Sequence, residues 1–349
     1  MRPRTHHMTP PAVDPRRPGL MWPVAIDPGG VTGPTPAQAR GRHWEAGTRG
    51  LYLPVDRDPA LAVDQRIVTA AALLPAGGAV TGWGALRWAG ARYLDGTRGR
   101  HDLPVDLAVP GPVIRSREGI RPTEEVHLRR ETVELDGLTL SAHVASVGFA
   151  VRHATTLEDA VAMVDRACAA DLVSIAELRA FRHSLTGQRW VTRLDRAVDL
   201  AVENCWSPME TVLRLCWRSM GITNVVCNQP VFALDGTFLG TPDVLDVDTG
   251  TGGEYDGALH LAGPQRAKDI RREGVLRRHG LEYVEMTAGD LRDTTDFRQR
   301  TMDARGRAEA LPRNWTLAPP PWWTETHTVE LRRALAPWQR DRFLRWQAS

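Results

Sequence analysis

The hydrophobic and polar positions in the second half of the chain follow two periods, one typical of a helix and one of extended strands. From Ser207 to Met220 apolar residues recur at helical spacing, and Pro208 stands at the first helical position. Short apolar runs follow, and Asp235-Gly236 is a favoured hairpin turn. The pattern predicts a helix over 207–220, strands over 225–234, 238–247 and 254–256, a helix over 264–279 and a strand over 281–286. This order predicts an α/β sandwich core of about 90 residues.

The first half alternates shorter helical and extended patterns. Thr35 caps a helix with Pro36 and Gln38 at its first and third positions, and we expect this helix to run toward Trp44. The other predicted helices are 65–74, 81–88, 156–170 and one opened by the capping box Ser174-Ile-Ala-Glu177, and the predicted strands are 50–55, 105–109, 126–128 and 138–140. The elements of the first hundred residues fit a small winged-helix-like module with a β-rich extension.

Composition divides the chain into four segments. Residues 1–28 are rich in Pro and Arg and are expected to be poorly ordered, whereas 311–349 form a tail rich in Trp and Pro. Between them, 29–200 hold the winged-helix-like module and its extension, and 201–310 hold the α/β core. The expected fold class is α/β in the broad sense (α+β). The tryptophans of the tail either stack on single-stranded nucleic acid or pack the tail onto the domains, as large aromatics do in most proteins.

Charge and cysteine content set few limits on function. The net charge of +2 and pI near 8.5 permit a nucleic-acid partner without requiring one. Lys268 is the only lysine; a GC-rich genome explains this bias, and arginine also grips phosphate in a bidentate manner. The four cysteines lack zinc-ligand spacing and fit a reducing compartment. Without a signal-peptide pattern or a membrane span, the protein is expected to be cytoplasmic with no membrane partner.

A cluster of carboxylates follows the predicted hairpin. Because alternate side chains of a strand share a face, Glu254 and Asp256 are expected to point the same way while Tyr255 packs on the other side. Together with Asp243 they offer the hard oxygen ligands that Mg²⁺ or Mn²⁺ prefers. Alternatively, these residues are solvated acids beside Gly-rich turns. Their apolar neighbours favour the metal site, because gathering like charges costs energy unless a cation is present.

Other polar residues near this cluster have two interpretations each. Glu210 either completes a capping box with Ser207 or assists the metal, and the two roles are compatible. Asp256 either joins the site or belongs to an Asp-Gly turn. His260 either orients water or phosphate or is merely structural. The helix after the third strand is either solvated or grips DNA phosphates through a basic face that includes Arg266, Lys268, Arg271, Arg272, Arg277 and Arg278.

Together these residues resemble the PD-(D/E)XK nuclease superfamily, and within it the very-short-patch-repair-like endonuclease domains. The matching text is Ser207-Pro-x-Glu210, Pro242-Asp243, Glu254-Tyr-Asp256-Gly257 with His260, Arg266-x-x-Asp269-x-x-Arg272 and Gly280-Leu-Glu-Tyr-Val284. The resemblance covers roughly residues 205 to 295. It implies a restriction-endonuclease-like mixed sheet flanked by helices. It also implies hydrolysis of a DNA phosphodiester with Asp243 and Glu254 holding a divalent metal and Glu210 assisting.

The chain departs from this pattern at one position. The superfamily's lysine would fall at position 256, which is Asp in this chain. Lys268 on the following helix would replace that charge, or else Arg266 or His260 would serve.

The first half is similar to antitoxin-type modules of the AbiEi kind. The matching text is Thr35-Pro-Ala-Gln-Ala-Arg40, Arg49-Gly-Leu-Tyr52 and Thr81-Gly-Trp-Gly-Ala-Leu86. This resemblance implies a winged-helix DNA-binding role with Arg40, Arg42 and Arg49 at phosphates. Alternatively, the module is structural and its arginines are scattered over the surface.

The sequence therefore predicts a Mg²⁺- or Mn²⁺-dependent DNA endonuclease or nickase, in DNA repair or in defence against foreign DNA. The competing hypothesis is an antitoxin-like DNA-binding regulator whose nuclease fold has lost its activity. A third hypothesis is a nuclease that cuts only modified, mismatched or structured DNA. A homodimer is compatible with each, and the sequence names neither the target nor the trigger.

Overall fold

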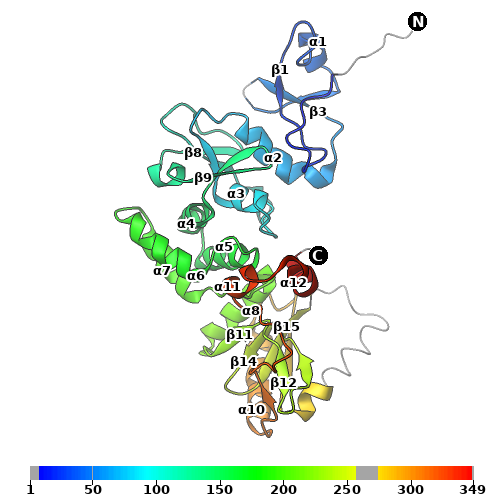
Figure 1. Cartoon of the computed structure of the whole chain (residues 1–349), viewed down its shortest axis with the longest axis vertical. Helices are drawn as coiled ribbons and strands as arrows, with labels where there is room; N and C mark the ends of the chain where they lie inside the picture. The colour runs from blue at the N-terminus through cyan, green and yellow to red at the C-terminus, as the bar shows by residue number, and fades with distance from the viewer. Residues whose placement is uncertain (1–7, 49, 257–273, 348–349) are drawn as a thin grey trace, which may run out of the picture. The chain divides into compact units, whose positions relative to one another are not determined.

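The structure is a computed structural model that describes residues 8–48, 50–256 and 274–347. The chain divides into two compact units, Met1–Ala150 and Val151–Ser349 (Figure 1). Both combine helices with strands, so the α+β class expected from the sequence is confirmed. The boundary proposed at residue 200 lies inside the second unit, which also includes the tail after residue 310.

The first unit begins with a three-stranded antiparallel sheet. Its order is β1–β3–β2, with β1 at Val24–Ala25, β2 at Trp44–Ala46 and β3 at Leu51–Pro54. Helix α1 (Pro36–Ala39) starts as predicted, with the capping box of Thr35 and Gln38 formed. The prediction that it runs toward Trp44 is wrong, because Gly41 interrupts it and Trp44 pairs with Pro54 in the sheet.

Residues 8–28 pack onto this unit although their composition predicts poor order. The Leu20 side chain is buried, and the Gln65 side-chain amide bonds both the N–H and the C=O of Met21, at 3.1 and 2.8 Å. Specific tertiary contacts of this kind supply the ordering that proline-rich composition does not reveal.

A five-stranded mixed sheet follows in the order β8–β7–β4–β10–β9. The strands predicted at 105–109 and 138–140 are two of its five, the other three were not predicted, and the strand expected at 126–128 is a 3₁₀ turn. The strands of this sheet are β4 (Ala79–Thr81), β7 (Val105–Ala108), β8 (Ile120–Thr123), β9 (Thr132–Leu135) and β10 (Leu138–Ser141). The other elements of this region are η1 (Pro59–Leu61), α2 (Ala62–Ala71), α3 (Gly82–Trp88), η2 (Val126–Arg129) and the short hairpin of β5 (Thr97–Arg98) with β6 (His101–Asp102).

Asp106 on β7 is a buried carboxyl whose pKa is raised to about 6 by burial, against the opposing effect of Arg121 at 2.5 Å. An acid with a raised folded-state pKa favours the folded state below its unfolded pKa, and this contribution is lost as pH rises toward 6. As the pH rises from 3.5 to 6.5, we expect Asp106→Asn to gain about 3 kcal/mol of unfolding free energy relative to wild type. Urea unfolding across this range measures the difference, and a constant difference would contradict the assignment.

The second unit opens with helices packed against one another. They are α5 (Leu157–Ala169), α6 (Ile175–Arg182), η3 (His183–Leu185) and α7 (Val191–Leu200), and they follow α4 (His143–His153), which spans the unit boundary. Helix α5 begins where predicted, with Thr156 as its cap, and the predicted capping box of α6 at Ser174 is confirmed. Helix α8 (Pro208–Ser219) packs on α5, where Arg214 and Asp165 form a buried ion pair at 2.6 Å.

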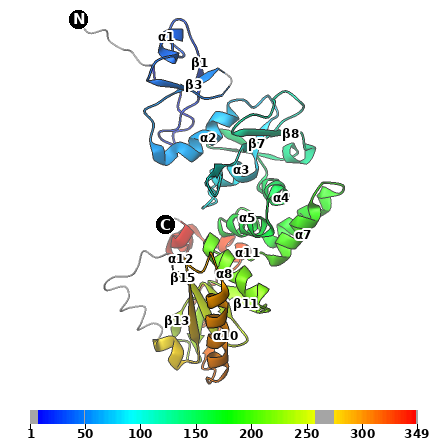
Figure 2. The same ribbon diagram turned by 180° about the vertical axis from the view of Figure 1, so that it is seen from behind.

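The central sheet of this unit has the order β11–β14–β15–β16, with β11 at Val225–Cys227, β14 at Val244–Asp246, β15 at Thr251–Asp256 and β16 at Glu282–Thr287. The first three strands are antiparallel neighbours, whereas β16 is parallel to β15. Helices α8 and α10 (Thr295–Glu309) cover one face (Figure 2). Between β15 and β16, residues 274–278 are helical, in agreement with the end of the predicted 264–279 helix.

The two long strands predicted at 225–234 and 238–247 are each broken in the middle. Residues 228–230 and 241–243 interrupt them, with Pro230 and Pro242 unable to donate to a ladder. The outer halves, β12 (Val231–Ala233) and β13 (Phe238–Gly240), form a separate sheet with β17 (Trp315–Thr316). The Asp235-Gly236 turn between them is confirmed, with Gly236 at φ 86°.

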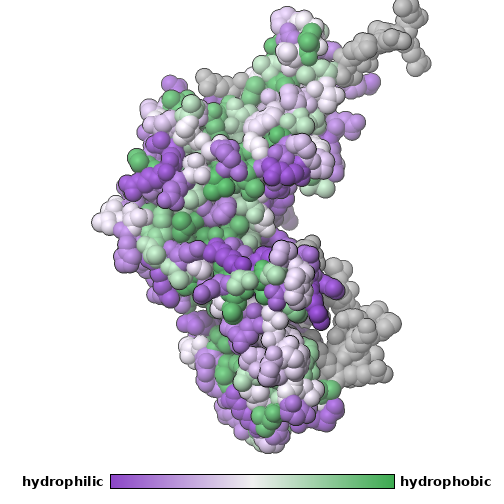
Figure 3. Space-filling view, in the orientation of Figure 1, coloured by the Kyte–Doolittle hydropathy of each residue, from purple (hydrophilic) through white to green (hydrophobic). Residues whose placement is uncertain are grey.

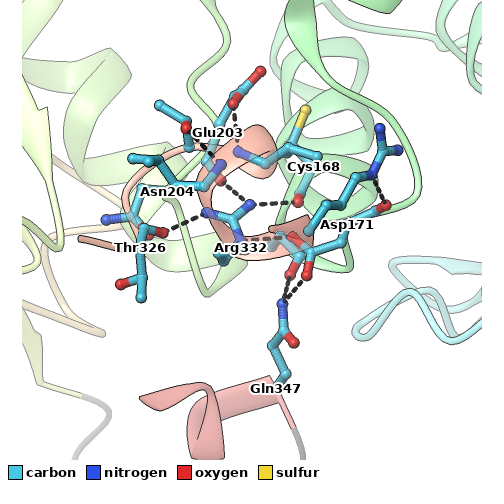
Figure 4. A network of polar contacts seen from close by, with 12 residues as sticks. Cys168, Asp171, Glu203, Asn204, Thr326, Arg332 and Gln347 are labelled. Atoms are coloured by element: carbon cyan, nitrogen blue, oxygen red, sulfur yellow. Dashed lines mark hydrogen bonds and ion pairs between the residues drawn. The ribbon is translucent and has the colours of Figure 1, made fainter. Parts of the chain in front are cut away.

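The tail after residue 310 is part of this unit. Buried Arg332 on α11 (Val329–Arg333) donates to Asp171 Oδ1 and to the carbonyls of Thr326, Cys168 and Glu203 (Figure 4). Beyond α12 (Pro337–Phe343), in η4 (Arg345–Gln347), Trp346 stacks on Trp206 with ring centroids 4.5 Å apart. The interpretation that the tail packs onto its domain therefore applies here, although Trp322 and Trp338 are more than 60% exposed, at 63% and 62%.

The surface drawn in Figure 3 intermixes hydrophilic and hydrophobic residues. In the three described ranges, every helix falls short of the length and apolar character that crossing a membrane requires.

Candidate functional site

Glu210 lies at the start of α8, but it does not complete the capping box that Ser207 and Glu210 predict. Ser207 Oγ accepts the Glu210 N–H at 3.2 Å, which is half of the motif. The Glu210 carboxylate instead accepts the backbone N–H of Trp206 at 2.6 Å and the Asn228 side-chain amide at 2.5 Å. In α6, by contrast, the Glu177 carboxylate returns to the Ser174 N–H as the motif requires. The Glu210 carboxylate therefore bonds the residue just before its cap and the residue just after β11.

Asp243 stands at the break before β14, next to the third strand. Its Oδ2 accepts the Tyr255 N–H at 3.0 Å, and its carbonyl accepts the Asn228 N–H at 3.1 Å. Because Val244 pairs with Gly253, the next step of the antiparallel register places Asp243 beside Glu254. The two residues that the sequence singled out as metal ligands therefore lie side by side, Asp243 just before β14 and Glu254 on β15.

The alternation predicted along β15 agrees with the packing. Tyr255 contacts the core cluster under α8 and α10, and a Cβ built on Gly253 would lie 2.7 Å from Trp217 Cζ2. Only glycine fits at that position. Glu254 and Asp256 consequently share the opposite face, where the parallel register places Glu254 beside Glu285 of β16.

The negative charges of Glu210 and Asp243 repel each other. Glu210 is 6% exposed, and burial raises the pKa of its carboxyl, with the Asp243 charge as the second cause. The donors at Trp206, Asn228 and Ser207 act in the other direction. A cation beside the pair would relieve the repulsion, and carboxylate oxygens are the donor set that Mg²⁺ and Mn²⁺ prefer. The chemistry of this pair suits such an ion, but two carboxylates are fewer ligands than a complete metal shell contains.

The complete metal shell expected from the sequence is not assembled by the described side chains. In residues 8–48, 50–256 and 274–347, no three His, Cys, Asp or Glu side chains form a group that could hold a metal ion. The charge of Asp243 acts on the Glu210 carboxyl, the strand register places Asp243 beside Glu254, and Asp256 ends β15.

Several predicted site residues lie outside the described residues or in the first unit. His260, Arg266, Lys268, Arg271 and Arg272 fall in 257–273, and Arg49 is likewise outside the described ranges. Arg40 and Arg42 are exposed beside α1, and Arg42 Nε donates to His43 at 3.3 Å. The phosphate-binding roles of these arginines stay predictions.

Sequence reasoning missed Asn228, Asn204 and Trp206, which surround Glu210. Asn204 Nδ2 donates to the Asn228 carbonyl at 2.9 Å, and Trp206 Nε1 donates to Asn204 Oδ1 at 2.8 Å. Asn228 adopts φ 46°, a left-handed conformation in which asparagine is enriched. Asparagine two residues before Pro230 is a turn signal that would have located the break in the predicted strand.

Comparison of the chain with protein-family models, with curated proteins and with solved structures found no match. The function proposed below therefore rests on the residues of this chain and on the contacts they make.

Proposed function

We propose that the second unit is a divalent-metal-dependent DNA endonuclease or nickase that acts in DNA repair or in defence against foreign DNA. The observation that carries this proposal is the pair of Glu210 and Asp243, a buried carboxyl and a carboxylate-bearing strand end that Asn228 bonds together. Burial and repulsion raise the pKa of Glu210, a cost that a bound Mg²⁺ or Mn²⁺ would offset.

The order of elements supports the same proposal. Helix α8, the antiparallel strands β11, β14 and β15, and the parallel strand β16 follow one another as the resemblance to PD-(D/E)XK nucleases implies. Pro242-Asp243 precedes β14, and Glu254 lies on the adjacent β15. The motif residues thus lie at the same end of two neighbouring strands, β14 and β15.

Each residue has a defined part in this mechanism. Asp243 and Glu254 would hold the cation, and Glu210 would support it from the helix. When bound, the cation supplies a water of lowered pKa and offsets charge on the phosphate. Asp256 cannot donate the proton or positive charge that a lysine would, so we assign that part to Lys268, Arg266 or His260. The first unit would hold DNA through Arg40, Arg42 and Arg49.

Asp256 also favours the alternative function, an antitoxin-like DNA-binding regulator with a degenerate nuclease fold. A third carboxylate at this position repels the phosphate that a lysine would attract. In this case the protein binds DNA but cuts none.

The test incubates full-length protein with supercoiled plasmid and Mg²⁺ or Mn²⁺, with EDTA as the control. We expect nicked or linear plasmid with metal and none with EDTA. Calorimetric titration of Mn²⁺ into the protein without DNA also detects a nuclease that needs a modified or structured substrate. DNA binding without cleavage and without Mn²⁺ binding would overturn the enzyme proposal in favour of the regulator.

A further inference from the structure

Asn228 is the residue that contacts both carboxylate-bearing segments. Its side-chain amide donates to Glu210 Oε2 at 2.5 Å, and its backbone N–H donates to the Asp243 carbonyl at 3.1 Å. It follows β11 directly, so the break in the predicted strand creates this contact. A continuous strand would have alternated past this point without turning the amide toward α8.

Asn228 is itself held from a second direction. Its side-chain amide also donates to the Asn204 carbonyl at 3.0 Å, and the Asn204 amide donates back to the Asn228 carbonyl at 2.9 Å. The Asn228 side chain is buried, with 4% of the residue exposed. Its amide group therefore has a fixed direction, with one hydrogen toward Asn204 and the other toward Glu210.

We propose that Asn228 is a positioning residue for the metal site, which orients the Glu210 carboxylate so that Glu210 and Asp243 engage one divalent cation. This inference rests on the proposed function. The amides of Asn228 and Trp206 both donate to Oε2, which restricts rotation of the carboxylate before a cation arrives. A carboxylate ordered in advance loses less conformational freedom when it binds a metal.

The test uses Asn228→Gly in the full-length protein. Glycine adopts φ 46° without strain, so this substitution removes the amide and preserves the backbone. We expect Mn²⁺ to bind about 10- to 100-fold more weakly than in wild type, as for other lost partners of metal-binding carboxylates. Calorimetry without DNA measures the affinity, and thermal unfolding shows that the protein is folded at the assay temperature.

The matched control is Asn224→Gly, at the other end of β11. The Asn224 amide donates to Asp248 Oδ1 at 2.6 Å, a comparable bond to a carboxylate that no site residue uses. We expect this variant to bind Mn²⁺ as wild type does. A merely structural role for Asn228 would lower the unfolding midpoint and leave the Mn²⁺ affinity of the folded protein unchanged.

The outcomes separate this inference from the proposed function. If wild type binds Mn²⁺ and Asn228→Gly binds it equally well, or if Asn224→Gly loses as much affinity, the inference is overturned and the proposed function stands. If wild type binds no Mn²⁺, the inference is overturned, and if it also cuts no plasmid, the proposed function is overturned with it. Should Asn228→Gly not fold, Asn204→Ala loosens Asn228 while leaving it in place, and unchanged Mn²⁺ affinity there overturns the inference.

Discussion

Replacing Asp243 by Asn is expected to abolish metal-dependent DNA cleavage while making the metal-free protein more stable. The amide oxygen of Asn still accepts the Tyr255 N–H that Asp243 Oδ2 accepts at 3.0 Å, so the strand end keeps its bond. What is lost is the negative charge that would hold the cation. Because loss of even an outer partner of a metal ligand costs about 10- to 100-fold, we expect cleavage to fall by at least about 100-fold.

The gain in stability has the same origin. The charge of Asp243 raises the pKa of Glu210 in the folded protein, so ionised Glu210 destabilises the folded state. In the unfolded chain, Glu210 ionises without this repulsion. Removing that charge lowers the folded-state pKa of Glu210 and stabilises the folded protein above the unfolded pKa of a glutamate. Loss of activity together with raised stability is typical of residues kept for function rather than for folding.

Asp248→Asn is the matched control for this prediction. Asp248 lies just beyond the same strand, is exposed, and bonds the Asn224 amide. We expect its plasmid cleavage and its urea midpoint in EDTA to equal those of wild type. An Asp243→Asn protein that cuts at the wild-type rate would show that Asp243 holds no metal, and one that is less stable in EDTA would contradict the predicted effect of its charge on Glu210.

Replacing Arg332 by Met is expected to destabilise the second unit by about 3–5 kcal/mol, the cost of breaking a buried ion pair on one side. Arg332 is fully buried, and its Nε donates to Asp171 Oδ1 at 2.6 Å. Met fills much of the same volume but leaves the carbonyls of Cys168 and Glu203 without this donor. Arg340 still donates to Asp171 Oδ2 at 2.8 Å, which keeps the loss within this range.

Urea unfolding followed by tryptophan fluorescence measures this effect, because Trp206 and Trp346 stack near the tail. Arg333→Met is the control. Arg333 bonds Glu177 at 2.7 Å, but both side chains are more than a third exposed, and exposed pairs contribute about 0–1 kcal/mol. Equal effects of the two substitutions would mean that Arg332 contributes no more than a surface arginine.

The Arg332 contacts also connect the tail to the candidate site. The Trp206 that stacks under Trp346 is the residue whose N–H holds Glu210. A tail that detaches from α5 would remove this cover from the start of α8. We therefore expect Arg332→Met to weaken Mn²⁺ binding as well, even under conditions where most of the protein stays folded.

The elements that could be predicted are those specified by neighbouring residues. The caps at Thr35, Thr156 and Ser174 and the Asp235-Gly236 turn depend on side chains within four positions of the backbone groups they serve. The alternation along β15 is likewise local. Where this prediction was wrong, a pairing between strands decided the structure. Trp44 was expected at the end of a helix, but it pairs with Pro54 in a sheet.

The sequence alone determined the α+β class, the helix caps, the Asp235-Gly236 turn and the acidic residues that indicate a metal site. Only the tertiary structure decided where those residues meet. The Ser207-x-x-Glu210 spacing describes a closed capping box, yet the Glu210 carboxylate accepts from Asn228, 18 positions along the chain, and has its pKa raised by the charge of Asp243. The reason is physical: a carboxylate bonds whichever donors the folded chain places nearest, and local spacing cannot specify donors that arrive from another strand.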